Sequence, residues 1–166
     1  MMRKGERTGA ERLQVTCARR MAATCVVAFV CVAPTFAQAD CYDEAAQHHQ
    51  VNPWILRAIA AQESSFNPNA KHPKNADRST DYGLTGLNSV HLRELARYGV
   101  TAADMMDSCK SVYLAGWHLS NMVKRFGNTW EAVGAYHSKT PSRRDSYAGK
   151  IRRIVDFWIE TGVITR

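Results

Sequence analysis

Residues 52–64 read Asn-Pro-Trp-Ile-Leu-Arg-Ala-Ile-Ala-Ala-Gln-Glu-Ser and carry the clearest structural signal in the chain. Asn52 is a favoured N-cap residue, and Pro53 suits the first helical position because its missing N–H has no partner there. The apolar residues that follow recur at three- and four-residue steps, as one face of a helix requires. Glu63 stands four residues after Ile59, so it continues this apolar face. We therefore expect an amphipathic helix that ends in a carboxylate on its buried side.

Helical patterns recur on either side of this segment. Helix-forming composition or helical spacing of apolar residues occurs at 43–50, 90–99, 108–126, 130–136 and 147–158. Ser108 and Asn128 are predicted to cap two of these helices at their N-termini. Polar residues dominate residues 66–79 and leave no periodicity, which predicts a long surface loop. No alternating strand pattern is present. The prediction is an all-α single domain with a long loop after the helix that carries Glu63.

The first 39 residues have the features of a secretory signal peptide. Six basic residues precede an uncharged apolar run from Met21 to Pro34, which is shorter than a membrane-spanning helix of about 20 residues. Ala37-Gln38-Ala39 then matches a small-x-small cleavage site. We expect cleavage after Ala39, a folded domain over residues 40–166 in the periplasm, and no stable membrane insertion afterwards. An uncleaved anchor or a short buried helix is the alternative interpretation.

The charge balance argues against a nucleic-acid partner once this leader is removed. The full chain has 22 Lys and Arg residues and 15 Asp and Glu residues, a net charge of +7. Six of the basic and two of the acidic residues lie in the leader, so residues 40–166 carry a net charge of +3. A mildly basic surface is compatible with an anionic polymer, although this signal has little specificity.

Cys41 and Cys109 are the two cysteines that remain after the leader is removed. An even pair in an oxidising compartment predicts a disulfide between them. Metal binding would need further ligands at suitable spacing, which His48, His49 and His118 do not supply. We expect neither a metal nor a cofactor.

The position of Glu63 suggests acid catalysis. Burial beside apolar residues disfavours a carboxylate, and the negative end of the helix dipole acts in the same direction. Both effects raise the pKa of Glu63, so its acid form can persist near neutral pH. Cleavage of a glycosidic bond needs such a proton donor for the leaving oxygen. The alternative is an ordinary solvent-exposed glutamate at a helix end.

Three blocks of sequence resemble the lytic transglycosylases related to goose-type lysozyme. The first surrounds the catalytic glutamate of that family, the second follows about sixteen residues later, and the third lies in a later helix. In this chain they read Gln62-Glu63-Ser64-Ser65-Phe66-Asn67-Pro68, then Ser79-x-Asp81-x-Gly83-Leu84 continuing to Asn88-Ser89, then Ala135-Tyr136. The small size of the chain and the segment Tyr136-His137-Ser138-Lys139-Thr140-Pro141 resemble a branch of this family associated with invasion and type III secretion systems.

The resemblance implies a lysozyme-like fold that acts on peptidoglycan glycan strands, with secretion-apparatus proteins as further partners. Glu63 would be the catalytic acid and base, and Tyr136 would hydrogen-bond or orient it. From the residues alone, a buried aromatic on a helix face is the preferred interpretation of Tyr136. The resemblance further assigns substrate binding to Ser64, Ser79, Gly83, Asn88 and His137.

The chain departs from the family pattern at two places. Gly86 stands where the family commonly has a glutamine, so we expect one missing sugar contact that Gly86→Gln would restore. His137 replaces the usual asparagine of the third block. Asp81 is the only acidic residue of these motifs that could approach Glu63, and we interpret it as fixing the loop turn through its own backbone.

With one effective carboxylate, the expected reaction is a lyase reaction that leaves a 1,6-anhydro end at MurNAc. Two rivals remain. One is a hydrolytic muramidase on the same fold. The other is a weakly active or non-catalytic wall-binding assembly module, which Gly86 and His137 favour.

Overall fold

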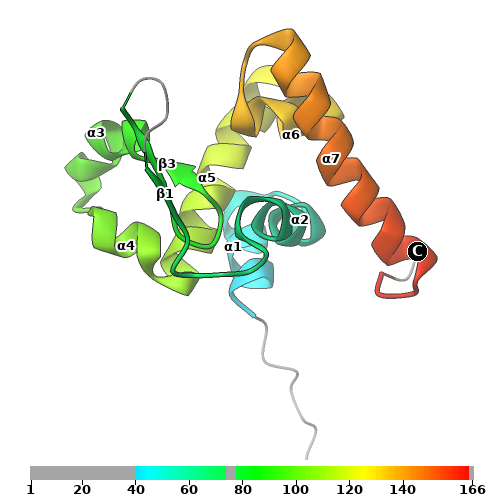
Figure 1. Cartoon of the computed structure of the whole chain (residues 1–166), viewed down its shortest axis with the longest axis horizontal. Helices are drawn as coiled ribbons and strands as arrows, with labels where there is room; N and C mark the ends of the chain where they lie inside the picture. The colour runs from blue at the N-terminus through cyan, green and yellow to red at the C-terminus, as the bar shows by residue number, and fades with distance from the viewer. Residues whose placement is uncertain (1–39, 74–77, 165–166) are drawn as a thin grey trace, which may run out of the picture. The chain divides into compact units, whose positions relative to one another are not determined.

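The computed structural model describes residues 40–73 and 78–164, and the expected signal peptide, 1–39, lies outside this part of the chain. Helices dominate, as predicted (Figure 1). Their bounds are α1 (Cys41–His49), α2 (Pro53–Ser64), α3 (Leu92–Leu95), α4 (Ala102–Met106), α5 (Ser108–Phe126), α6 (Trp130–His137) and α7 (Pro141–Glu160), with 3₁₀ turns η1 (Ser89–His91) and η2 (Ala96–Tyr98). None of the described helices is long and apolar enough to cross a membrane.

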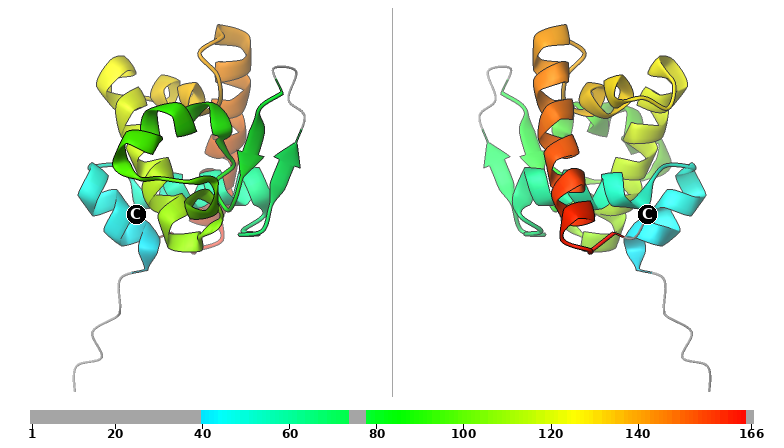
Figure 2. Two further views of the ribbon diagram at one scale, coloured as in Figure 1. Left: turned by 90° about the vertical axis from the view of Figure 1, so that its left-hand side faces the viewer. Right: turned by 90° about the vertical axis from the view of Figure 1, so that its right-hand side faces the viewer.

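Helix α2 begins as its sequence predicts. The Asn52 side chain accepts hydrogen bonds from the backbone N–H groups of Trp54 and Ile55, and Pro53 occupies the first turn. Leu56 and Ile59 are fully buried, in one cluster with side chains of α1, α5, α6 and α7. Helix α2 contacts α1, α5 and α7, an arrangement visible in the two side views of Figure 2. Its last turn is thus held in place by the core.

The predicted loop, residues 66–79, contains the first strand of a small antiparallel sheet whose other two strands follow it, so the prediction of a loop without strands was wrong in part. Strand β1 (Lys71–Pro73) pairs with β2 (Thr80–Tyr82), which pairs with β3 (Leu87–Asn88). Strands of two or three residues are too short to show an alternating pattern of apolar and polar residues. Leu87 is buried with Leu95 and Met105 in a second cluster, which attaches the sheet to α3 and α4.

The boundaries of several other helices also differ from the predictions. The predicted helix at 90–99 is divided into η1, α3 and η2, and the short helix α4 was not predicted. Asp107 and Thr129, rather than Ser108 and Asn128, cap α5 and α6. In each case the cap lies one residue from the predicted position, and its side chain accepts a hydrogen bond from a backbone N–H three residues later.

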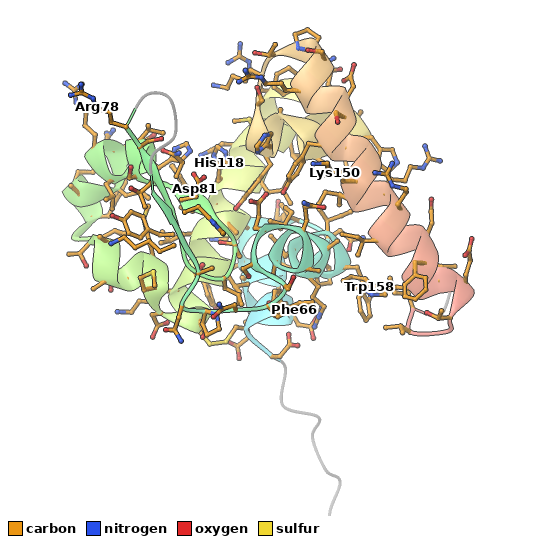
Figure 3. The ribbon with its side chains drawn as sticks, viewed as in Figure 1. Phe66, Arg78, Asp81, His118, Lys150 and Trp158 are labelled. Carbon is orange, nitrogen blue, oxygen red and sulfur yellow. A yellow bond between two sulfur atoms is a disulfide. The ribbon has the colours of Figure 1, made fainter. Side chains whose placement is uncertain are left out.

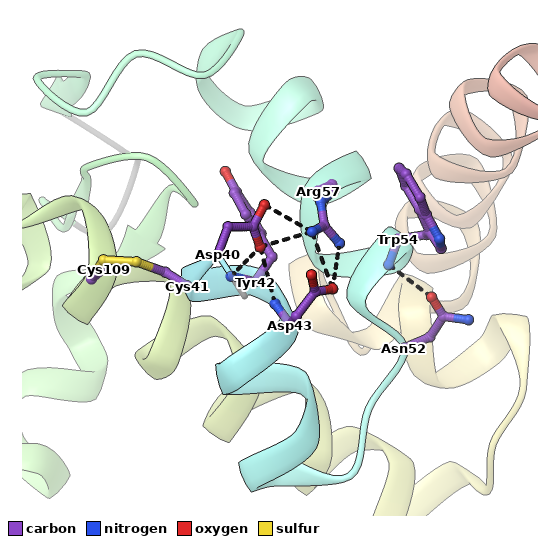
Figure 4. Close-up of polar contacts among 8 residues, drawn as sticks. All are labelled: Asp40, Cys41, Tyr42, Asp43, Asn52, Trp54, Arg57 and Cys109. Atoms are coloured by element: carbon purple, nitrogen blue, oxygen red, sulfur yellow. Dashed lines mark hydrogen bonds and ion pairs between the residues drawn. A yellow bond between two sulfur atoms is a disulfide. The ribbon is translucent and has the colours of Figure 1, made fainter. Parts of the chain in front are cut away.

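The N-terminal end of the described chain is fixed by ionic and covalent links. Cys41 and Cys109 form the predicted disulfide, with their Cα atoms 5.3 Å apart, and so join the starts of α1 and α5. Arg57 of α2 binds both carboxylate oxygens of Asp40 at 2.7 and 2.8 Å (Figure 4). The same guanidinium lies 5.1 Å from the ring centre of Tyr42 and 4.8 Å from that of Trp54. These contacts hold α1 against α2.

Candidate active site

Glu63 lies in the last turn of α2, and its carboxylate is bound by a tyrosine from the far end of the chain. The hydroxyl of Tyr147, on α7, donates a hydrogen bond of 2.6 Å to Glu63 Oε1. Tyr147 is only 4% exposed. Helix α2 ends directly afterwards, because Ser65 and Phe66 both adopt left-handed backbone conformations, with φ of 52° and 63°.

The surroundings raise the pKa of Glu63 above its ordinary value. Burial is the main cause, and the negative charge of Asp81 acts in the same direction. The hydrogen bond from Tyr147 and the positive charges of His72 and Lys150 partly oppose it. The direction agrees with the sequence-based expectation, and the site therefore favours the protonated acid.

Gly86 lies directly against the Glu63 side chain. A Cβ atom at position 86 would be 2.7 Å from Glu63 Oε2 and 2.9 Å from its Cβ. The φ of Gly86 is +59°, in the region that glycine adopts most readily. The glycine thus makes room for the carboxyl group. The expectation that a glutamine here would simply add a sugar contact is not compatible with this geometry.

Tyr136 does not make the predicted hydrogen bond to Glu63. Its hydroxyl donates instead to the backbone carbonyl of Thr85, at 3.0 Å, and a phenol has one hydrogen to donate. Burial raises the pKa of Tyr136 far above its ordinary range. Its ring is stacked on that of Tyr147, with centroids 6.5 Å apart. Tyr136 therefore supports the tyrosine that binds Glu63.

Tyr147 is the site residue that sequence reasoning missed, because it was placed only in the apolar stripe of the last helix. The ring of His137 also stacks on Tyr147, with centroids 4.9 Å apart and an interplanar angle of 7°. Burial lowers the pKa of His137.

His118 binds the backbone of Tyr136. Burial lowers the pKa of His118 to about 4, so that its ring is neutral. Its Nε2–H can then donate to the carbonyl oxygen of Tyr136, 3.0 Å away.

Residues of the second sequence block border the same cavity as Glu63. Asn88 Nδ2 donates hydrogen bonds of 2.7 Å to Ser79 Oγ and to Asp81 Oδ1. Asp81 and Asn88 face each other across strands β2 and β3. Asn88 therefore holds the Asp81 carboxylate, and the expected turn contact of Asp81 with its own backbone stays a prediction.

Two of the predicted substrate-binding residues have structural contacts. The Ser64 hydroxyl lies 2.7 Å from the Leu84 carbonyl oxygen and accepts from the Asn67 backbone N–H. Gly83 is buried, with a φ of +70°, and a Cβ there would overlap the carbonyl oxygen of Met105. Ser64 borders a neighbouring hollow of about 450 Å³.

The remaining predicted residues surround one cavity of about 490 Å³. Asp81, on strand β2, and His118, on α5, border this cavity and are labelled in Figure 3. The predicted site residues in its lining are Glu63, Ser79, Asn88, Tyr136 and His137, together with Asp81 and Gly86. Within the described part of the chain, no three His, Cys, Asp or Glu side chains group as candidate metal ligands. The cavity can present a buried acid to a neutral, polar ligand.

Comparisons with known proteins agree with this geometry. Residues 40–149 match the family model described as the transglycosylase SLT domain, a lysozyme-like domain. Invasion protein IagB of Salmonella typhimurium (strain SL1344) is 40% identical over 120 residues, which cover 69% of this chain and 74% of that protein. Protein IpgF of Shigella flexneri is 33% identical over 120 residues (72% and 78% covered). X polypeptide of Escherichia coli (strain K12) is 36% identical over 124 residues (69% and 72% covered). The chain therefore belongs to the transglycosylase SLT domain family, whose members are lytic transglycosylases that act on peptidoglycan.

Proposed function

We propose that this protein cleaves the MurNAc–GlcNAc bond of peptidoglycan in the periplasm, with Glu63 as its catalytic acid and base. The observation that carries the proposal is the setting of Glu63: a carboxyl group of raised pKa, bound by Tyr147, in the wall of the 490 Å³ cavity. An acid that stays protonated at higher pH than an ordinary glutamate is suited to protonating a leaving glycosidic oxygen.

The proposed reaction needs one carboxyl group. Glu63 donates its proton to the bridging oxygen as the bond from that oxygen to MurNAc C1 breaks, and the acetamido group of the same sugar stabilises the positive charge that develops. The Glu63 carboxylate then takes the proton from the MurNAc 6-hydroxyl, whose oxygen bonds to C1. This closes a 1,6-anhydro ring, consumes no water and restores the acid.

One observation favours a second candidate, a hydrolytic muramidase. Asp81 borders the same cavity as Glu63, and Asn88 holds its carboxylate in place. Hydrolysing glycosidases use two carboxyl groups, the second as a nucleophile or as a base for water. Asp81 is the residue that could take this role.

A digestion of purified sacculi distinguishes the two reactions. Released fragments from the parent protein, Glu63→Gln and Asp81→Asn would be weighed by mass spectrometry, because an anhydro end lacks one water. We expect anhydro ends from the parent and, at reduced yield, from Asp81→Asn, with Glu63→Gln inactive. Hydrolysed ends, with both variants inactive, would establish the muramidase. Intact sacculi that bind the parent without any cleavage would establish the non-catalytic wall-binding module.

The leader and a role in assembling a secretion apparatus belong to the same proposal. The segment 1–39 has the features of a signal peptide, and one relative carries the name of an invasion protein. Local opening of the wall would give such an apparatus passage. Expression of the full chain in a Gram-negative bacterium, followed by fractionation and N-terminal sequencing, tests the export step. We expect a periplasmic protein that begins at Asp40, whereas retention of residues 1–39 would support an anchor.

A further inference from the structure

The positively charged side chains of helix α7 divide into two groups. Arg144 forms ion pairs with Glu131 and Asp145, and Arg152 with Asp156 at 3.8 Å. The second group is Arg143, Lys150 and Arg153. These three are exposed, and within residues 40–73 and 78–164 they form no ion pair or hydrogen bond. Helix α7 thus carries some positively charged side chains that are paired with carboxylates and others that are free to bind a ligand.

The three available cations lie along one side of α7. Positions 143 and 150 are two helical turns apart and positions 150 and 153 about one turn apart, which places all three on the same side of the helix. Arg143 borders both the 490 Å³ cavity and a second hollow of about 360 Å³. Lys150 borders that second hollow and a third of about 420 Å³. The row of cations therefore starts at the Glu63 site and leads away from it.

Aromatic side chains accompany the far end of this row. Phe66 and Phe157 border the third hollow with Arg153, and they are 47% and 59% exposed. Figure 3 shows Lys150 and Trp158 along α7, with Phe66 just beyond the end of α2. A positive φ is rare for a bulky residue, and Phe66 is held at 63°. No carboxylate is among the described residues that border this hollow. Exposed apolar and cationic groups next to a cavity are typical of a binding surface.

We propose that this surface, the α7 face (Arg143, Lys150 and Arg153 with Phe66 and Phe157), binds the acidic peptides attached to peptidoglycan glycan strands. The proposal rests on the function proposed above. The sugar backbone itself offers little charge once its lactyl groups carry peptides, whereas each peptide carries free carboxylates on a short chain with aliphatic parts. Unpaired cations beside exposed aromatic rings complement such a ligand, and the face is continuous with the cavity that would hold the sugars.

The α7 face would make the enzyme prefer strands that still carry their peptides. The test compares intact glycan strands with the same strands after an amidase has removed the peptides. We expect Arg153→Gln to lower kcat/KM for the peptide-bearing strands about two- to fivefold relative to the bare strands, the range for one exposed ion pair. Arg153→Lys should restore most of the preference, because it keeps the charge.

Arg152→Gln is the matched control, because Arg152 is the adjacent residue and is paired with Asp156. It should leave the rates on both substrates unchanged. Lys150→Gln serves as a second test variant. Its rates are compared with those of the parent at low pH, where Glu63 is protonated in both proteins, because the charge of Lys150 also lowers the pKa of Glu63. Thermal melting of each variant checks that it is folded.

A binding measurement on soluble strands keeps this inference separable from the proposed function. Binding of the parent and of Arg153→Gln to labelled glycan strands, before and after amidase treatment, would be measured by fluorescence polarisation. We expect amidase treatment to lower the bound fraction of the parent more than that of Arg153→Gln. Equal binding and equal rates with and without peptides would overturn the inference, whether or not cleavage occurs. Absence of cleavage of either substrate would instead contradict the proposed function alone.

Discussion

Tyr147 and Glu63, 84 positions apart in the chain, share a hydrogen bond of 2.6 Å that joins α7 to the last turn of α2. Gly86 lies against the other carboxylate oxygen of Glu63. The Glu63 carboxyl group thus lies between the Tyr147 hydroxyl, which donates a hydrogen bond to it, and the backbone of Gly86, which has no side chain. Both contacts constrain what substitutions at this site should do.

Glu63→Gln should lower the cleavage rate by about 10²–10⁴-fold, because it keeps the shape of the side chain but has no proton to donate. Release of soluble fragments from sacculi measures the rate. Activity within tenfold of the parent would mean that another group supplies the proton.

The same substitution should stabilise the protein at neutral pH. The pKa of Glu63 is raised in the folded state, so its favourable contribution is complete below the unfolded value of about 4.5 and is lost as the pH rises through the folded pKa. Above that point the folded protein contains an ionised, buried carboxylate, which Gln removes. We expect a higher Tm for Glu63→Gln at pH 7 and a smaller difference at pH 4. A lower Tm at pH 7 would show that the ionised form is the better accommodated one.

Tyr147→Phe and Asp81→Asn should move the pH profile in opposite directions. The hydrogen bond from Tyr147 lowers the pKa of Glu63, so its loss should extend activity to higher pH. The charge of Asp81 raises the same pKa, so Asp81→Asn should move the alkaline limb to lower pH. The measurement is kcat/KM against pH for the three proteins. A common direction of shift, or none, would contradict the assignment of this limb to Glu63.

Gly86→Ala should lower activity by about 10²-fold, because its Cβ would displace the Glu63 carboxyl group by a fraction of an ångström or more. Gly99→Ala is the matched control. Gly99 also has a positive φ, of 75°, but a Cβ there meets no atom within 4 Å. We expect the control to lose some stability and no activity. If Gly86→Gln bound sugars more tightly and remained active, the original expectation for this position would be restored.

The double variant Cys41→Ser/Cys109→Ser should lose about 4 kcal/mol of unfolding free energy, as the chain-entropy model gives for a loop of 68 residues. Neither cysteine borders the cavity, so the activity of the folded variant should be unchanged. Urea unfolding with and without reductant provides the measurement. A parent protein that is equally stable after reduction would argue against this account.

The features that could be predicted from the sequence are those that depend on residues close together along the chain. The N-cap at Asn52, the buried face of α2 and the raised pKa of Glu63 all follow from the local order of residues. The disulfide could be predicted because residues 40–166 contain only two cysteines. These inferences needed no knowledge of how the helices pack.

The features that were missed depend on contacts between distant segments. Tyr147 has the spacing of a core residue, and nothing in its neighbours indicates that its hydroxyl reaches Glu63. The role of Gly86 also depends on tertiary structure, because the absence of a side chain matters only where Glu63 of α2 packs against it. The pairing of Asp81 with Asn88 required a sheet whose strands were too short to recognise.

Asp40 determines where this chain can be shortened. Its side chain accepts hydrogen bonds from the backbone N–H groups of Tyr42 and Asp43 and binds Arg57 through both oxygens. None of these contacts involves an earlier residue. A recombinant protein that begins at Asp40 would therefore keep the cap of α1 and the Asp40–Arg57 ion pair, whereas one that begins at Cys41 would lose both and keep only the contacts of Arg57 with Tyr42 and Asp43. For anyone producing the domain, the usable boundary lies between Ala39 and Asp40.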